Sequence, residues 1–248
     1  GVIGVCCAYF LAKEGADVTL VERDQIGEGA SGGNAGTIAA GHPPLNKPGR
    51  IRRSIMELLD PTSPLYIPLR WDPSLAKWLW TFRRFCTDRH LDVSMSALAP
   101  LGHATLKLFD SLVEEEALNC AYKRGGYYEV CHTEKGLDEA KKDAAMMLAH
   151  GYHPQTLTGG ELLEIEPALL DGISGGVHFP DAATCDPYRF VVELADRAAR
   201  HGGRFQTGQG VAEILSTGSR VKGIRLGNGE VLEADSVVLA TGAYGGHL

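Results

Sequence analysis

Three features are scarce in this sequence, and each scarcity excludes a class of protein. No apolar run approaches the roughly 20 residues that a membrane-spanning helix needs. The six cysteines include no C-x-x-C pair, so the spacing of a zinc ribbon or a redox pair is absent and we expect no metal site. Positive charge is also in short supply. The formal net charge of -7 argues against a nucleic-acid partner held by a broad basic surface.

An initial methionine is also missing, and the first residues look like an interrupted motif. Gly1-Val2-Ile3-Gly4 matches the last four positions of G-x-G-x-x-G, the glycine pattern of dinucleotide-binding proteins. We therefore expect the first glycine and the strand before it to lie upstream of residue 1. On this interpretation the sequence is a fragment.

The apolar pattern predicts an α/β fold. Val5 to Lys13 forms an apolar stretch without proline or glycine, which suits a buried helix. Asp17 to Glu22 is β-branched and apolar, as expected of a strand buried on both faces of a parallel sheet. Together they form the second half of a βαβ unit. Ser236 to Ala240 reads as a second fully buried strand near the end of the chain.

Between these segments the pattern is mixed. Gly27 to Gly41 is too glycine-rich for a helix, and His42 to Pro73 is proline-rich coil. Asp186-Pro187 has the form of a helix N-cap followed by proline at the first helical position. The other expected elements are helices at 74–86, 98–118, 134–150 and 187–200, and strands at 126–131, 176–180, 204–207, 211–216, 221–226 and 230–232.

The expected helix at 74–86 carries an apolar stripe with two interpretations. Its members recur at helical spacing: Leu75, Trp78, Leu79, Phe82 and Phe85. Such a stripe either packs in a core or faces a membrane. We favour the core, because the opposite face is not strongly basic.

Glu22 gives weight to the N-terminal glycine pattern. It ends the first strand at about the 20-residue distance expected of an acid that binds the ribose of a dinucleotide. Gly1 allows close approach of the pyrophosphate, and the helix start supplies free N–H groups. A carboxylate here also repels a 2′-phosphate. The alternative is an ordinary helix–strand pair with a surface glutamate, and we favour the dinucleotide.

Further motifs identify the dinucleotide through a family resemblance. They are Val21-Glu22-Arg23-Asp24, Gly29-Ala30-Ser31-Gly32-Gly33-Asn34-Ala35-Gly36, the proline-rich segment His42 to Gly49, Ser63-Pro64-Leu65, Trp78-Leu79, Glu166-Pro167, Asp186-Pro187 and Val238-Leu239-Ala240-Thr241-Gly242-Ala243. Their order resembles the FAD-dependent D-amino-acid oxidase/dehydrogenase superfamily, most closely the bacterial D-amino-acid dehydrogenase (small subunit) branch.

The resemblance implies roles for individual residues in binding FAD. Ser31 is expected near the pyrophosphate, and Asn34, Ala35 and Gly36 are expected to pass the flavin ring and offer backbone N–H groups. The other cofactor-binding residues that we expect are Gly1, Val2, Ile3, Gly4, Glu22, Arg23, Val211 (to adenine), Thr241 and Gly242. For Ser31 and Asn34 the alternative is plain turn chemistry.

His42 is the one ionisable group that we expect on the substrate side, just past the flavin-contacting loop. A surface histidine in a proline-rich loop is the other interpretation. The flavin carries the difficult step itself. In the family, the groups that bind the substrate carboxylate lie partly in a C-terminal third, which we expect to be missing here.

The resemblance implies an enzyme that oxidatively deaminates D-amino acids or cyclic imino acids and passes electrons to a quinone or other carrier. The alternatives are an oxygen-using glycine or sarcosine oxidase and, in another class, an inactive fragment or binding module. Its partners would be an amino-acid substrate and an electron acceptor or partner subunit.

The expected organisation is a discontinuous, Rossmann-like FAD-binding domain of residues 1–45 and 186–248. An inserted α+β substrate-side region spans residues 46–185. Unpaired cysteines suggest reduced, intracellular usage, and we expect a cytoplasmic protein or one peripheral on the inner face of the cytoplasmic membrane.

Overall fold

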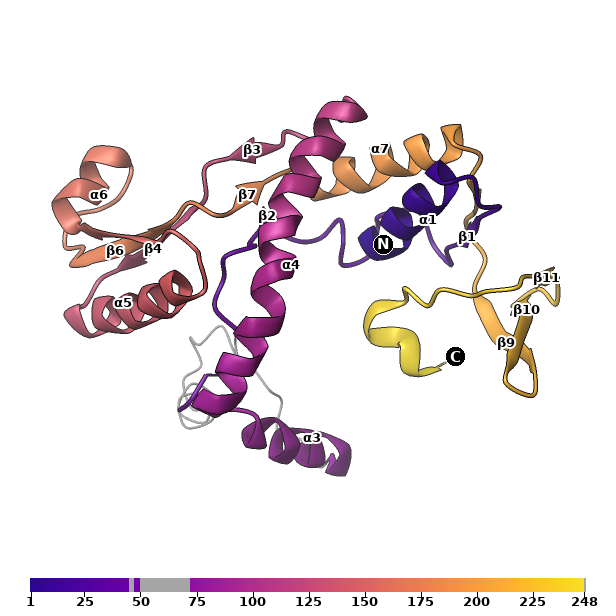
Figure 1. Cartoon of the computed structure of the whole chain (residues 1–248), viewed down its shortest axis with the longest axis horizontal. Helices are drawn as coiled ribbons and strands as arrows, with labels where there is room; N and C mark the ends of the chain where they lie inside the picture. Colours follow the sequence, from indigo (N-terminus) through magenta and orange to yellow (C-terminus); the bar gives the residue numbers. More distant parts are fainter. Residues whose placement is uncertain (45–46, 50–71, 248) are drawn as a thin grey trace. The chain divides into compact units, whose positions relative to one another are not determined.

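A computed structural model of the chain describes residues 1–44, 47–49 and 72–247 (Figure 1). The predictions made for residues 50–71, including the Ser63-Pro64-Leu65 motif, lie outside this range. The chain divides into two compact units. Unit 1 comprises Gly1–Ile38, Phe109–Lys123 and Thr184–Leu248, and unit 2 comprises Ala39–Leu108 and Arg124–Ala183.

Unit 1 is built on two parallel strands. Helix α1 (Val2–Lys13) leads to strand β1 (Thr19–Val21), which pairs in parallel with β8 (Arg204–Gln206). Helix α7 (Pro187–Arg200) precedes β8 and packs beside α1. The buried side chains of both helices form one core with the inward side chains of the two strands: Val5, Tyr9, Phe190, Leu194, Leu20 and Phe205. This is the predicted α/β arrangement, but β1 is shorter than predicted and its residues are only partly buried, so the expectation of a strand buried on both faces is wrong.

The start of α7 follows the sequence signal. Asp186 is the N-cap, and its side chain accepts a hydrogen bond from the Arg189 N–H at 3.0 Å. Pro187 occupies the first helical position, where a missing N–H costs nothing. The prediction for this helix is confirmed.

An antiparallel meander completes the strands of unit 1. It consists of β9 (Val211–Thr217), β10 (Arg220–Leu226) and β11 (Val231–Glu233), in the order β11-β10-β9. Gly229, in the turn between β10 and β11, has φ +90°, which favours glycine. These predicted strands are confirmed.

The predicted strand Ser236 to Ala240 is wrong. The segment has no strand conformation, and Val238 and Leu239 are 59% and 53% exposed. Its β-branched residues favour extended backbone, but a strand also needs a partner, and no described segment pairs with this one. The chain then forms a short 3-10 helix, η1 (Gly242–His247).

Unit 2 contains a three-stranded antiparallel sheet in the order β4-β6-β5, with helix α5 packed against it. Its elements are α3 (Pro73–Arg84), β4 (Tyr127–Cys131), α5 (Glu134–Ala149), β5 (Gln155–Thr158), α6 (Gly159–Ile165) and β6 (Gly175–Phe179). Met147, Val177 and Phe179 are buried in its core. Strand β5 and helix α6 were not predicted.

The remaining elements include those at which the chain passes from one unit to the other. Helix α4 (Asp88–Glu115) begins ten residues before the predicted start and contains Pro100. Strands β2 (Thr37–Ile38), β3 (Lys123–Arg124) and β7 (Ala183–Thr184) form a small sheet in the order β2-β7-β3. None of the described helices is long and apolar enough to cross a bilayer.

The units differ from the predicted ranges in three respects. Residues 39–44, which include His42, belong to unit 2, and residues 184–185 belong to unit 1. Phe109–Lys123 belongs to unit 1, because Leu112, Leu118 and Cys120 are buried in the same core as α1 and α7. The assignment of FAD to the first range and of substrate to the second stays a prediction.

Candidate functional site

The candidate site begins at the start of α1. Gly1 is the N-cap and has no side chain to cap the helix. Instead, the Ser31 hydroxyl oxygen accepts a hydrogen bond from the Val2 N–H at 2.8 Å. The next N–H groups, of Ile3 and Gly4, have no intrahelical acceptor by helix geometry. A Cβ at Gly1 would lie 3.0 Å from Ser31 Oγ, so glycine lets this loop approach the helix.

Glu22 lies beside this helix start. Its Oε2 is 3.5 Å from the Gly1 nitrogen, and its side chain is 24% exposed. The backbone fixes its position, because the Glu22 N–H donates to the Gln206 carbonyl at 2.9 Å at the end of the β1–β8 ladder. The structure thus places Gly1 and Glu22 side by side, as their spacing in the sequence predicted. Ribose hydroxyls and an anion can be held side by side here.

A loop from the other end of the chain closes on the same acid. The Gln209 N–H donates to the Glu22 carbonyl and the Gly208 N–H to the Asp24 carbonyl, both at 3.1 Å. Val211 follows this loop as the first residue of β9. Arg23 lies nearby and donates through Nε to Asp24 at 2.9 Å. Val211 and Arg23 therefore belong to the same part of unit 1 as Glu22.

The glycine-rich loop is shaped by Asn34. Its Nδ2 donates to the carbonyls of Ala30 and Ser31, and its Oδ1 accepts from the Gly36 N–H at 2.7 Å. The Asn34 side chain thus performs the turn chemistry considered from the sequence. The Gly36 N–H already donates to Asn34. Of the three backbone N–H groups predicted to reach the flavin, this leaves those of Asn34 and Ala35.

Gly36 itself is required by packing. It has φ +69°, and a Cβ there would lie 2.0 Å from the Cys185 carbonyl oxygen. The Gly36 carbonyl accepts from the Cys185 N–H at 2.9 Å. The loop is therefore fixed against the residue that precedes the N-cap of α7.

The end of the chain also reaches α1. A Cβ at Gly4 would lie 3.4 Å from the Ala240 Cβ, so the segment that leads to Thr241 passes the first turn of the helix. Gly242 begins η1 with φ +59°. Thr241 and Gly242 thus follow directly after a contact with the candidate site.

His42 belongs to unit 2, whereas the residues around the start of α1 belong to unit 1. Its Nδ1 is 2.7 Å from the Pro43 carbonyl oxygen, which can only accept, so Nδ1 carries a proton and donates it to this oxygen. The ring stacks on Tyr127 at 5.9 Å between centroids, and Tyr127 stacks on Phe179 at 5.0 Å. The predicted role of His42 on the substrate side stays a prediction.

Tyr127 carries a signal that sequence reasoning missed. Its hydroxyl oxygen is buried and has no hydrogen-bond partner in the described part of the chain. Burial raises the pKa of this phenol, and the nearby Glu129 and Asp143 raise it further. A neutral donor without a partner therefore lies next to His42. No pattern in the sequence distinguishes it from the other strand tyrosines.

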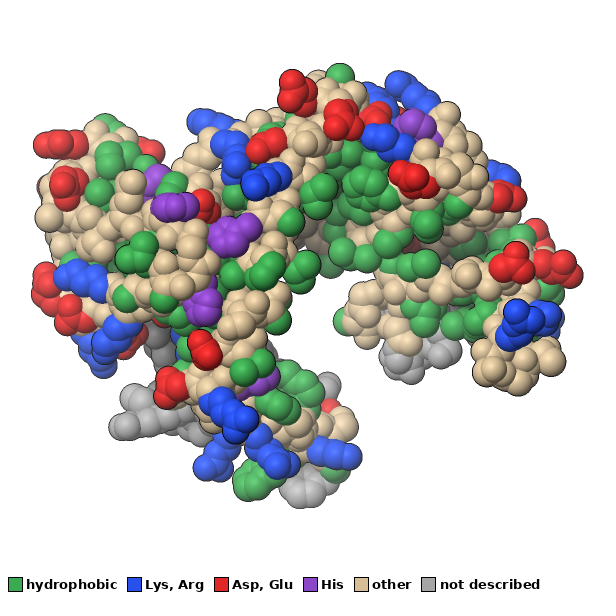
Figure 2. All heavy atoms as spheres, in the orientation of Figure 1, with side chains coloured by type: hydrophobic (Ala, Val, Ile, Leu, Met, Phe, Trp, Pro, Cys, Tyr) green, Lys and Arg blue, Asp and Glu red, His purple; other side chains and the backbone are tan. Residues whose placement is uncertain are grey.

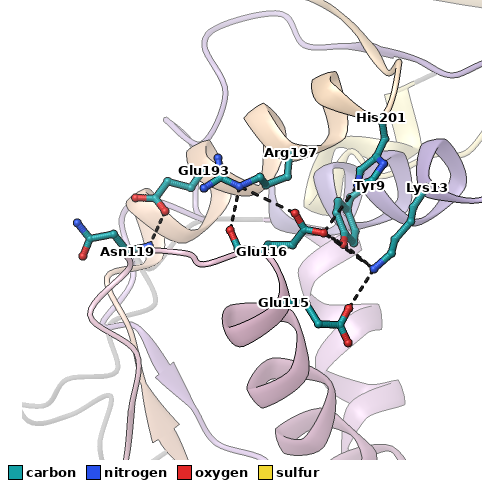
Figure 3. A network of polar contacts seen from close by, with 8 residues as sticks. All are labelled: Tyr9, Lys13, Glu115, Glu116, Asn119, Glu193, Arg197 and His201. Atoms are coloured by element: carbon teal, nitrogen blue, oxygen red, sulfur yellow. Dashed lines mark hydrogen bonds and ion pairs between the residues drawn. The ribbon is translucent and has the colours of Figure 1, made fainter.

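A polar network fixes the far end of α1 (Figure 3). The buried Tyr9 hydroxyl donates to Glu116 Oε1 at 2.5 Å and accepts from Lys13 Nζ at 3.0 Å. Arg197 on α7 donates to the Glu116 carbonyl at 3.0 Å, and His201 Nε2 lies 3.7 Å from Oε1. Glu116, which follows α4, therefore ties α1 to α7. No sequence pattern predicted these contacts.

The network also changes the acidity of its members. The Tyr9 hydrogen bond is the main reason why the pKa of Glu116 lies below its ordinary value. Burial, followed by the same bond, raises the pKa of Tyr9. Glu116 is thus an anion that its surroundings stabilise. Among the described residues, no group of three or more His, Cys, Asp or Glu could hold a metal ion.

Comparison with known proteins gives consistent results. The DAO family, described as FAD dependent oxidoreductase, matches residues 1–248. Glycine oxidase from Geobacillus kaustophilus is similar in structure, with a TM-score of 0.72 and 24% identity over 100% of this chain and 55% of that chain. L-proline dehydrogenase from P. horikoshii has a TM-score of 0.64 and 19% identity over 99% of this chain and 52% of that chain.

A third similar structure is L-amino acid deaminase from Proteus myxofaciens. Its TM-score is 0.67, with 19% identity over 98% of this chain and 44% of that chain. The chain therefore spans about half the length of the structures it matches. At these identities the likeness shows the fold, and it confirms the predicted α/β FAD-binding class. The family match shows the superfamily and does not single out the D-amino-acid dehydrogenase branch.

Proposed function

Because the chain belongs to the DAO family of FAD-dependent oxidoreductases, whose cofactor is FAD, we propose that it carries the cofactor-binding part of an enzyme that oxidises an amino acid at its carbon–nitrogen bond. The names of similar structures support this substrate class. Amino acids appear in the names of three of them: glycine oxidase, L-proline dehydrogenase and L-amino acid deaminase.

The observation that carries the proposal is the contact of three segments at the start of α1. Glu22 Oε2 lies 3.5 Å from the Gly1 nitrogen, and Ser31 Oγ accepts from the Val2 N–H. These residues fit FAD: the helix start and Ser31 would hold the pyrophosphate, and Glu22 would accept from the ribose hydroxyls. Each charge-assisted hydrogen bond of this kind contributes about 1.5–3 kcal/mol.

The chemistry requires that one proton leave the substrate ammonium group and that a hydride leave the substrate Cα, which converts the amino acid to a protonated imine. FAD, when bound, supplies the acceptor for the hydride. His42 is the group that we propose to handle the proton. Because its Nδ1–H donates to the Pro43 carbonyl, its Nε2 can accept a proton from a substrate ammonium group. The neutral Tyr127 hydroxyl beside it can donate to a substrate oxygen.

In its finer form, the proposal is oxidative deamination of a D-amino acid or a cyclic imino acid, with electrons passed to a quinone or another carrier. The family resemblance of the Ser31 to Gly36 loop and of the proline-rich segment after it supports this form. An oxygen-using oxidase is the second candidate, favoured by the similarity in structure to glycine oxidase.

The test uses the full-length protein that contains this chain. Purified protein should be yellow, and anaerobic addition of its substrate should bleach the flavin absorbance. D-alanine, D-proline, glycine and sarcosine are the trial substrates, with L-alanine and L-proline as matched controls for the two chiral ones. Reoxidation by a soluble quinone but not by oxygen supports the dehydrogenase, and reoxidation by oxygen supports the oxidase. A flavin that no amino acid bleaches would contradict the proposal, and a colourless protein would leave only a binding module.

A further inference from the structure

Helix α3 is unusual because none of its residues is buried. It begins at Asp72, whose side chain accepts from the N–H groups of Ser74 and Leu75, and it has proline at its first position. Trp78 and Trp80 are 58% and 64% exposed. The sequence favoured a core location for the apolar stripe of this helix, and that prediction is wrong: Leu75, Leu79 and Phe82 are only partly buried.

Cations accompany these aromatic side chains. Lys77, Arg83 and Arg84 lie on α3, and Arg89 follows at the start of α4. Residues 72–90 contain these four cationic side chains and only two carboxylates, although the whole chain has a net charge of -7. The Arg83 guanidinium lies 5.5 Å from the centre of the Trp80 ring. Figure 2 shows basic side chains gathered beside hydrophobic ones over this helix. The surface of α3 is thus both apolar and positive.

This combination fits one kind of partner. Trp rings favour the boundary between headgroups and acyl chains, and Lys and Arg are attracted to anionic lipids. A helix of 12 residues is about 18 Å long, too short to span a bilayer but sufficient to lie in its surface. We propose that α3 docks the protein on an anionic lipid bilayer, with Trp78 and Trp80 at headgroup level and Lys77, Arg83 and Arg84 on the phosphates.

Charge complementarity argues for lipid over another protein copy. A second copy of this chain would bring the same cations to the interface, and like charges repel. An anionic bilayer supplies an apolar layer and negative charge together. The inference does not depend on which amino acid the enzyme oxidises.

The test measures co-sedimentation of the full-length protein with vesicles. We expect binding to phosphatidylglycerol/phosphatidylcholine vesicles at low ionic strength, little binding to phosphatidylcholine alone, and release by high salt. The triple variant K77Q/R83Q/R84Q should bind at least about tenfold more weakly, since each cation near an anionic surface contributes about a fivefold factor. The matched control is K135Q/K141Q/K142Q on α5, which removes the same charge from exposed positions and should bind as the wild type does.

A second pair of measurements tests the two tryptophans. The variant W78S/W80S should also bind more weakly, and brominated lipid should quench wild-type tryptophan fluorescence more than that of W78F/W80F. Flavin content and turnover with a soluble acceptor should be unchanged in all these variants, which separates this proposal from the proposed function. Equal loss of binding in the two triple variants, or no binding at low salt, would overturn it. So would a dimer that W78S/W80S converts to a monomer.

Discussion

The hydroxyl of Tyr9 donates a hydrogen bond of 2.5 Å to Glu116, a residue 107 positions later in the chain. Tyr9 lies within α1, the helix whose start forms the candidate cofactor site. Glu116 in turn contacts Arg197 and His201 in and after α7. The orientation of this helix is therefore fixed by a carboxylate at the end opposite the candidate site.

Replacing Tyr9 by phenylalanine should test this relationship. The change removes the hydroxyl that Glu116 and Lys13 share and leaves a largely buried carboxylate without its closest donor. We expect the free energy of unfolding to fall by about 1–3 kcal/mol. Urea unfolding followed by circular dichroism measures it. Tyr128→Phe, at an exposed tyrosine on β4, is the control and should change stability by less than about 0.5 kcal/mol.

Glu116 should make the stability depend on pH in a predictable direction. Its pKa in the folded protein is lowered, chiefly by the Tyr9 hydrogen bond, relative to about 4.3 in the unfolded chain. A lowered pKa means that its contribution is fully present above the unfolded value and is lost as pH falls through the folded one. Wild type should therefore lose more stability than Glu116→Gln between about pH 5 and pH 3. Parallel curves for the two proteins over this range would be evidence against the bond.

Replacing Glu22 by alanine should weaken FAD binding to the full-length protein by at least about tenfold, because the ribose hydroxyls lose their charged acceptor. Flavin absorbance after dialysis, or titration of the apoprotein, measures the effect. Glu28→Gln removes an exposed carboxylate from the neighbouring loop and serves as the control. If Glu22→Ala retains full flavin occupancy, the dinucleotide interpretation of α1 and β1 fails.

Gly36→Ala should disrupt the glycine-rich loop. The new Cβ would lie 2.0 Å from the Cys185 carbonyl oxygen, and φ +69° disfavours a side chain. We expect a loss of about 2 kcal/mol or more in stability, together with reduced flavin occupancy. Thermal unfolding and flavin absorbance test both parts. Gly29→Ala is the matched control, because a Cβ there meets nothing within 4 Å.

Helix caps and apolar periodicity in the sequence predicted those elements whose ends are determined by residues close in the chain. The helix after Gly1 and the Asp186-Pro187 helix start are confirmed, because caps and helical periodicity act within a few positions. The helix after Gly1 is buried on one face only, since Phe10 and Leu11 are exposed. The juxtaposition of Gly1 and Glu22 was predictable as well, since a helix and the strand after it determine that distance.

Features that depend on distant partners were not predictable. Ser236 to Ala240 has the composition of a strand but no pairing in the described chain, and composition cannot report a partner. The start of α4 at Asp88 was missed because Pro100 reads locally as a point near a helix boundary. The bond between Tyr9 and Glu116 joins side chains with no common sequence pattern.

The parallel pairing of Thr19 with Arg204 has a consequence for biosynthesis. The two residues are 185 positions apart. Ribosomes add roughly 5–20 residues per second, so β1 leaves the ribosome on the order of 10–40 s before its partner is made. Every residue of unit 2 is translated within that interval. Unit 2 can therefore fold while the chain is still growing, and β1 and β8 can pair only after it has been made.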